Sequence, residues 1–175
     1  SPLRSIRCDR DERMTAPLPE PHRVLVREVR AETVIDASPE IIWGVLTDFT
    51  SYPEWNPFIR PIEGKLWVGT RLLVEIRPPG RRSMWFRPRV LRVAKDREFR
   101  WIGRVLIAGL FDGEHRFTII PEDGGSRFVQ AEVFTGLLVP VVDLTDTLRA
   151  THLGFLLMNR ALKERAQWIA PGKPS

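Results

Sequence analysis

Apolar positions between residues 37 and 62 change their spacing in a way that predicts a capped helix followed by a bend. Ser38 is a residue type that caps helices, and Pro39 suits the first turn because its missing N–H needs no partner there. The following apolar side chains recur at steps of one, three and four: Ile41, Ile42, Val45, Leu46 and Phe49. This single stripe predicts a short helix with one face packed against another layer.

Prolines and aromatic residues dominate the segment after that helix. Pro53 and Pro57 exclude one long continuous helix, while Tyr52, Trp55 and Phe58 place three aromatic side chains close together. We therefore expect a second helical turn and a bent, aromatic-rich cover over a ligand cavity.

Strand-like alternation of apolar and polar residues flanks this helical pair. One strand is expected at 24–35, and turn residues such as those at 78–80 and 122–125 separate the later segments. The later strands are expected at 59–67, 71–77, 84–93, 98–106, 110–120 and 127–138. Short strands at regular spacing predict an antiparallel meander, and with the helices an α+β fold.

A long helix is predicted to close the chain, beginning after Pro140 and ending near Ile169, with Asp143 as its cap. At about 1.5 Å per residue, roughly 25 residues span ~37 Å, enough to lie across a curved sheet. One face of this helix holds Leu144, Leu148, Thr151, His152, Phe155, Asn159, Leu162 and Ala166.

The two ends of the chain lack an apolar period. Residues 1–23 alternate charge with proline, which predicts a disordered leader, and Met14 is a possible native start. We expect one domain over 24–170 and a flexible tail at 171–175.

Composition narrows the class of protein. Hydrophobic residues make up 43% and charged residues 28% of the 175, as is ordinary for a globular protein, and no apolar run approaches the ~18–20 residues that span a bilayer. The lone Cys8 has no internal disulfide partner and no secretion signal is recognisable, so we expect a cytoplasmic protein. Short metal-binding and phosphate-binding motifs are absent, so neither a metal nor a cofactor is expected. The oligomeric state, monomer or homodimer, stays open.

Positive charge concentrates in the middle of the chain. The net charge is +5, and residues 71–104 hold eleven Arg and Lys against three acids. This block is either a solvated sheet face, the interpretation that we favour, or a surface that attracts an anionic partner. Arg87 and Arg89 either point toward an acidic ligand or turn outward at a bulge near Pro88, and we favour the outward arrangement.

Four motifs allow a family resemblance to be stated. They are IDASPEIIW at 35–43, DFTSYPEWNP at 48–57, EVFTGLL at 132–138 and MNRALK at 158–163. The chain resembles the START-like, Bet v 1-like or polyketide cyclase/dehydrase (SRPBCC) superfamily over about 24–169. The resemblance implies a helix-grip fold, in which a curved antiparallel sheet of about seven strands surrounds the long C-terminal helix. That fold serves ligand carriers, lipid-transfer domains, aromatase/cyclases and chaperone regulators alike.

Alternation along the strands nominates side chains for the predicted cavity. His115 and Phe117 share the inner side of their strand with other apolar residues, and Trp101 lies on the apolar side of the strand before it. For the last strand both faces contain apolar residues, and the resemblance implies that Gln130 and Glu132 face inward. The predicted ligand-binding set is Phe49, Trp55, Trp101, His115, Phe117, Gln130, Glu132, Phe134, His152, Phe155 and Asn159.

His115 and Glu132 are the two candidates for acid–base chemistry. A buried Glu132 needs a partner or must lose its charge, so a nearby Arg or His is expected. If the two residues meet, they either stabilise each other's ionised forms or position a ligand hydroxyl. His115 as a satisfied core histidine is the alternative.

Three functions remain open. The first is binding of a small hydrophobic or amphipathic molecule, such as a lipid or an aromatic polyketide, without catalysis. The second is a polyketide aromatase/cyclase or dehydratase that uses His115 or Glu132 to move a proton. The third is docking of the basic surface to anionic lipid or nucleic acid, of which nucleic acid is the less expected partner. We favour the first.

Overall fold

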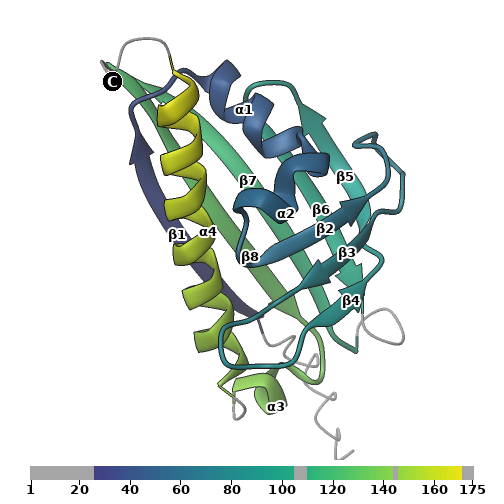
Figure 1. Cartoon of the computed structure of the whole chain (residues 1–175). Coiled ribbons are helices and arrows are strands. Elements are labelled where there is room, and N and C mark those ends of the chain that lie inside the picture. Colours follow the sequence, from purple (N-terminus) through teal and green to yellow (C-terminus); the bar gives the residue numbers. More distant parts are fainter. Residues whose placement is uncertain (1–25, 105–109, 144–145, 171–175) are drawn as a thin grey trace, which may run out of the picture.

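The computed structural model describes residues 26–104, 110–143 and 146–170 (Figure 1). Its strands are β1 (Val26–Ile35), β2 (Ile59–Glu63), β3 (Leu73–Ile76), β4 (Met84–Phe86), β5 (Arg89–Ala94), β6 (Glu98–Arg104), β7 (Asp112–Glu122) and β8 (Gly125–Thr135). Its helices are α1 (Pro39–Thr47), a 3-10 turn η1 (Phe49–Ser51), α2 (Tyr52–Trp55), α3 (Val139–Asp143) and α4 (Thr147–Ile169). The predicted leader at 1–23, the possible start at Met14 and the tail at 171–175 lie outside the described residues.

The strands form two antiparallel sheets rather than one. Five strands are ordered β1-β8-β7-β6-β5 and three are ordered β2-β3-β4. Backbone hydrogen bonds from Leu72 N to Pro88 O and from Val90 N to Thr70 O, both 2.9 Å, join the two sheets. In Figure 1 they curve around α4 and the short helices, as the α+β helix-grip prediction requires. That prediction is confirmed, with eight strands in the described part of the chain.

One predicted strand, at 84–93, is two strands in the structure. The break falls at Arg87 and Pro88, where the chain passes from the three-stranded sheet to the five-stranded sheet. Proline has no N–H to donate to a ladder, so a strand is interrupted at this position. Arg87 and Arg89 both lie exposed on either side of the buried Pro88, so they turn outward.

The short helices pack against the sheet by apolar contacts and a few polar anchors. Ser38 stands at the start of α1 but its side chain makes no capping hydrogen bond, contrary to the prediction. Tyr52 donates its hydroxyl to Leu46 O at 2.6 Å, and Asn56 Oδ1 accepts from the backbone N–H groups of Phe58 and Ile59, both at 2.9 Å. These bonds fix the turn that leads from α2 into β2.

The C-terminal helix differs from its prediction in three ways. The predicted continuous helix from Pro140 is divided into α3 and α4, because Asp146 adopts a left-handed φ of 54° before α4 begins. Asp143 ends α3 and does not cap α4. His152, which was predicted on the inner face, is exposed, because Thr151 and Phe155 define the buried side and His152 lies about 100° around the helix from Thr151.

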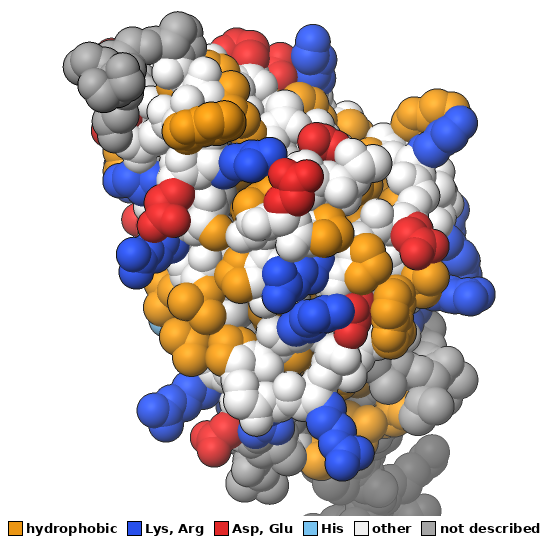
Figure 2. All heavy atoms as spheres, in the orientation of Figure 1, with side chains coloured by type: hydrophobic (Ala, Val, Ile, Leu, Met, Phe, Trp, Pro, Cys, Tyr) orange, Lys and Arg blue, Asp and Glu red, His pale blue; other side chains and the backbone are white. Residues whose placement is uncertain are grey.

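Apolar side chains also remain on the outer side of α4. Leu153, Leu156 and Leu157 are exposed, and Figure 2 shows apolar side chains gathered over the lower half of this helix.

Stacked aromatic rings fill most of the interior between the sheet and α4. Phe99 stacks on Phe117 with ring centres 4.4 Å apart, and Phe117 stacks on His115 at 4.2 Å. Phe155 of α4 approaches His115 at 4.9 Å. Core side chains therefore occupy much of the interior in which the sequence predicted a ligand cavity.

Close packing between α4 and the chain entering β2 depends on a glycine. The ring of Phe58 lies against Gly154, where an added Cβ atom would come within 2.2 Å of the ring carbon Cδ2. Phe58 is buried and packs edge-to-face on Phe155 at 5.7 Å. Any side chain at position 154 would displace Phe58.

We predict that Gly154→Ala lowers the free energy of unfolding by roughly 1–3 kcal/mol, although alanine is the better helix former. The matched control is Gly44→Ala in α1, where an added Cβ meets no atom within 4 Å. That variant should gain roughly 0.5–1 kcal/mol. Urea unfolding measures both, and equal gains would show that the Phe58 contact does not constrain position 154.

Candidate functional site

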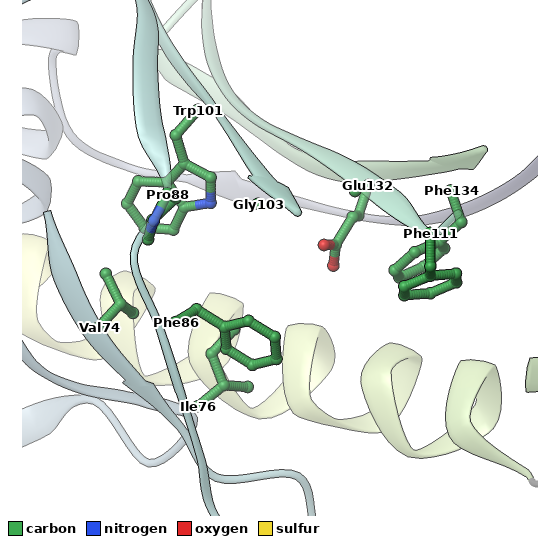
Figure 3. A pocket seen from close by; sticks show the side chains of 10 residues that line it. Val74, Ile76, Phe86, Pro88, Trp101, Gly103, Phe111, Glu132 and Phe134 are labelled. Atoms are coloured by element: carbon green, nitrogen blue, oxygen red, sulfur yellow. The ribbon is translucent and has the colours of Figure 1, made fainter. Parts of the chain in front are cut away.

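One apolar pocket remains between the two sheets (Figure 3). It lies between β3 and β4 on one side and β6, β7 and β8 on the other. Its volume is about 60 Å³, which at ~10–15 Å³ per water position is room for a few water molecules. Its walls are Val74, Ile76, Phe86, Pro88, Trp101, Gly103, Phe111, Gly113, Glu132 and Phe134.

Two glycines account for the position of the pocket. Gly103 and Gly113 face each other across β6 and β7, so the sheet lacks side chains at this point. A Cβ at Gly113 would lie 2.7 Å from Oε1 of Glu132, so the carboxyl group occupies the space above this glycine. A Cβ at Gly103 would meet only the Gly113 carbonyl oxygen, at 4.0 Å, so Gly103 opens directly onto the pocket.

Aromatic rings form the walls around Glu132. Phe111 and Phe134 stack with centres 5.3 Å apart and planes 17° apart. Figure 3 shows the Glu132 carboxyl group pointing into the space between this stacked pair and the side chains of Trp101 and Phe86. The pocket thus offers apolar surface on several sides and one ionisable group.

Glu132 is the first member of a short polar chain that leads into the core. His115 and Glu132 are direct partners in the register of β7 and β8, and Nδ1 of His115 lies 3.8 Å from Oε2 of Glu132. On the other side of the ring, Nε2 of Gln130 lies 2.9 Å from Nε2 of His115. A Gln130 N–H donated to Nε2 leaves the imidazole proton on Nδ1, the atom that faces Glu132.

Burial determines the charge of this pair. It lowers the pKa of His115 to about 3 and raises the pKa of Glu132 to about 8, because an apolar environment disfavours either charge. At pH 7 both groups are therefore neutral, and Glu132 is a carboxylic acid that can donate and accept a hydrogen bond. Its side chain keeps 15% of its surface exposed. The pKa directions argue against mutual ionisation of His115 and Glu132, one of the arrangements left open by the sequence. The alternative of a core histidine agrees with the full burial of His115 and its contact with Gln130.

The structure separates the predicted ligand-binding residues into groups. Those that line the pocket are Trp101, Glu132 and Phe134. Those that are buried elsewhere in the core are Phe49, His115, Phe117, Gln130, Phe155 and Asn159.

Three of the predicted residues need correction. Phe49 packs against Phe99 and Tyr52 instead of covering a cavity. Trp55 is half-buried beside Tyr52 and lines an outer groove next to Trp168. The pocket lies under β3 and β4, away from α1 and α2, so the helical pair is not its cover. His152 is exposed, as described above.

Sequence reasoning missed most of the opposite wall. Val74, Ile76 and Phe86 come from short strands whose pairing partners lie in a separate sheet. The paired glycines carried a weak signal, because a glycine inside a strand often marks close approach of another group.

Among the described residues, no group of three or more His, Cys, Asp or Glu side chains is arranged to hold a metal ion. No helix in the same residues is long and apolar enough to cross a membrane.

Comparison with known proteins decides the family. A sequence model of the family described as polyketide cyclase / dehydrase and lipid transport matches residues 26–156. The chain belongs to this family. The match runs from β1 into α4 and confirms the resemblance drawn from the four motifs. No curated protein matches this chain by sequence.

Solved structures show the same fold. They include a START superfamily protein from Mycobacterium smegmatis, with 23% identity and a TM-score of 0.60 over 82% of this chain and 99% of that one. The Zhui aromatase/cyclase from Streptomyces sp. R1128 has 14% identity and a TM-score of 0.65, covering 82% and 94%. Protein CV1439 from Chromobacterium violaceum has 19% identity and a TM-score of 0.63, covering 80% and 96%. At these identities the three structures show that the chain shares their fold and nothing further about it.

The raised pKa of Glu132 predicts a pH-dependent stability difference between the wild type and Glu132→Gln. Between the unfolded pKa of 4.5 and the folded pKa of about 8, the native state holds a proton that the unfolded state has lost. The stability of the wild type relative to the variant therefore falls as pH rises through this window, by at most about 1.4 kcal/mol per pH unit.

Urea unfolding of both proteins from pH 5 to pH 9 measures this difference. Glu28→Gln, which removes an exposed carboxyl group, controls for the loss of one charge. A difference that instead grows in favour of the wild type as pH rises would show that Glu132 is ionised in the folded protein.

Proposed function

We propose that the protein binds a small, mostly apolar molecule between its two sheets, with one carbonyl or hydroxyl group of the molecule hydrogen-bonded to protonated Glu132. The observation that carries this proposal is the pocket itself, with aromatic and aliphatic walls and a single ionisable side chain. Ligand pockets characteristically combine apolar walls with a few placed polar groups.

The chemistry of Glu132 favours a neutral ligand. A neutral carboxylic acid donates through its O–H and accepts through its C=O, so it matches a carbonyl, a hydroxyl or both. An anionic group of the ligand would force Glu132 to stay protonated and would itself lose hydration in apolar surroundings. The rings of Trp101, Phe111 and Phe134 offer flat surfaces on which an aromatic ligand could lie.

The size of the pocket limits what enters without rearrangement. A volume of about 60 Å³ is several-fold smaller than the ~300–1,000 Å³ typical of sites for drug-sized molecules. A multi-ring ligand therefore requires the outer wall to move. β4 is the short edge strand of the smaller sheet, paired on one side to β3, and we expect it to move outward when a large ligand binds.

Gly103→Val should block binding without unfolding the protein. Valine suits a strand, and its side chain would extend into the pocket, where a Cβ atom meets no close neighbour. For the wild type at ligand concentrations about 100 times Kd, binding adds roughly 2.7 kcal/mol of stability and raises Tm by several degrees. We expect Gly103→Val to abolish this rise while keeping the Tm of the free protein.

A thermal-shift screen of fatty acids, sterols and aromatic polyketides, followed by native mass spectrometry, provides the measurement. Gly44→Ala serves as a control that leaves the pocket intact. Absence of a shift with every apolar class would contradict the proposal. An unchanged shift in Gly103→Val would place the ligand elsewhere.

A second candidate function is proton transfer to a bound carbonyl compound, as in an aromatase/cyclase or a dehydratase. The observation that favours it is the pKa of Glu132, raised to about 8, because a general acid works best near the ambient pH. His115 would act through Glu132, as a positioning residue 3.8 Å away.

Deuterium exchange separates catalysis from binding. A carbonyl ligand identified by the screen is incubated in heavy water with wild type and with Glu132→Gln. Protonation of the carbonyl oxygen by Glu132 would make the hydrogens on the neighbouring carbons more acidic, so that solvent water removes one and a deuteron replaces it. This predicts exchange at those carbons that is at least ~10²-fold faster with the wild type. Tight binding with equal exchange in both proteins would leave binding as the only function.

A further inference from the structure

The outer face of the five-stranded sheet carries basic residues in two different settings. In one cross-strand row, Arg92, Arg100 and Arg116 lie opposite one another on β5, β6 and β7. Glu98 pairs with Arg92 at 3.0 Å and with Arg100 at 2.7 Å, and Glu114 pairs with Arg116 at 2.8 Å. In this row the positive charges are compensated by acids on the same face.

In the neighbouring row the acid is Glu114, opposite Ile102, and it pairs with Arg116 and Arg100 of the first row. Arg71 and Arg89 face each other in an isolated antiparallel bridge, and Arg89 lies opposite the apolar Ile102 on its other side. Among the described residues neither arginine makes an ion pair with an acid. Like charges placed directly opposite each other across strands destabilise a sheet. The fold therefore holds two arginines close together at some cost in stability.

Two further arginines complete the cluster. Arg87 precedes the buried Pro88, is exposed, and has no acidic partner in the described ranges. Arg104 lies 3.8 Å from Asp112 and is more than half exposed. Glu63 lies along an adjoining groove that Arg71 and Arg87 also line, without an ion pair to either.

These side chains surround a cleft of about 180 Å³. Its walls are Arg71, Arg87, Arg89, Leu91, Ile102 and Arg104. Leu91 is 40% exposed, so the cleft combines four guanidinium groups with apolar surface open to solvent.

We propose that this arginine cleft docks the protein onto anionic membranes by binding the headgroup phosphate of a phospholipid. Each guanidinium group presents paired N–H donors that match two phosphate oxygens. The phosphate would supply the negative charge that Arg71, Arg87 and Arg89 lack among the described residues. Leu91 and Ile102 would contact the apolar part of the interface, where basic and apolar side chains together favour binding to anionic lipid.

The exposed apolar residues favour a membrane over the other polyanions. A free phosphate ion gains nothing from Leu91 or Ile102. A single-stranded nucleic acid is held by exposed rings on which its bases stack, and the walls of this cleft contain none. The proposed partner is therefore a lipid membrane. Binding of phosphate or DNA without binding of vesicles would contradict the proposal.

The position of the cleft also links it to the ligand pocket. Pro88 lines the pocket, and its two neighbours in sequence, Arg87 and Arg89, line the cleft. In the same way Gly103 lines the pocket and the next residue, Arg104, lines the cleft. Docking would bring the wall of the pocket to the membrane surface. This last step, uptake of an apolar ligand from the membrane, rests on the proposed function, whereas docking itself does not.

The test compares the full chain with Arg71→Gln/Arg89→Gln in flotation with phosphatidylcholine vesicles that do or do not contain phosphatidylglycerol. Each basic side chain near an anionic surface contributes roughly a factor of five in affinity, so the double variant should bind phosphatidylglycerol vesicles about 30-fold more weakly. Its unfolding midpoint should not fall, because the change removes a like-charge contact. Leu91→Ser should weaken vesicle binding and leave folding intact.

The matched control is Arg160→Gln/Arg165→Gln on α4, which lowers the net charge by the same two units. These arginines pair with Glu164 and Glu54 and lie outside the cleft. Equal losses in both double variants would overturn the proposal, since they would reveal only an effect of net charge. The proposal would also be overturned if the wild type did not bind phosphatidylglycerol vesicles. It would fail as well if Arg71→Gln/Arg89→Gln lost binding to inorganic phosphate or duplex DNA but bound vesicles as the wild type does. Ligand shifts that depend on Gly103 test the pocket separately, so the two proposals fail independently.

Discussion

Burial of the Glu132 carboxyl group is the constraint on which the chemistry of this protein depends. The group lies above Gly113, between aromatic walls, with His115 as its neighbour in the β7–β8 register. An ion pair between the two would regain Coulomb energy but would require two desolvated charges at a separation of 3.8 Å, beyond hydrogen-bond length. Since desolvation dominates both pKa shifts, the neutral pair is favoured. The site is therefore suited to a neutral polar group.

The space in front of this carboxyl group exists because of local departures from regular strand structure. Gly103 and Gly113 remove two side chains from the sheet, and Pro88 forces the chain to leave one sheet and join the other. Elsewhere the stacked rings of Phe99, Phe117 and His115 fill the interior. The fold here leaves a small pocket between the two sheets, with the basic cleft on the other side of its wall.

The sequence predicted the fold well because its signals were local and strong. Alternation on β7 placed His115 and Phe117 inside, and the structure confirms both. The site was harder, because contacts between sheets leave no period in the sequence: nothing along the chain indicated that Phe86 would face Glu132. Helical spacing also placed His152 only approximately, since a rotation of one residue moves a side chain from the buried face to solvent. The sequence showed that basic residues concentrate at 71–104. Which of these arginines lie next to an acid became clear only from the register of β5, β6 and β7 in the structure.

The protonation state of Glu132 tests this account most directly. A titration followed by carbon NMR, with glutamate labelled at the side-chain carboxyl and the resonance assigned by its loss in Glu132→Gln, reports the ionisation of this one group. The account predicts a midpoint near pH 8 in the free protein, in line with the pKa that burial raises to about 8. A midpoint near the unperturbed 4.5 would contradict it, because Glu132 would then be a carboxylate at neutral pH and the pocket would suit a cation instead.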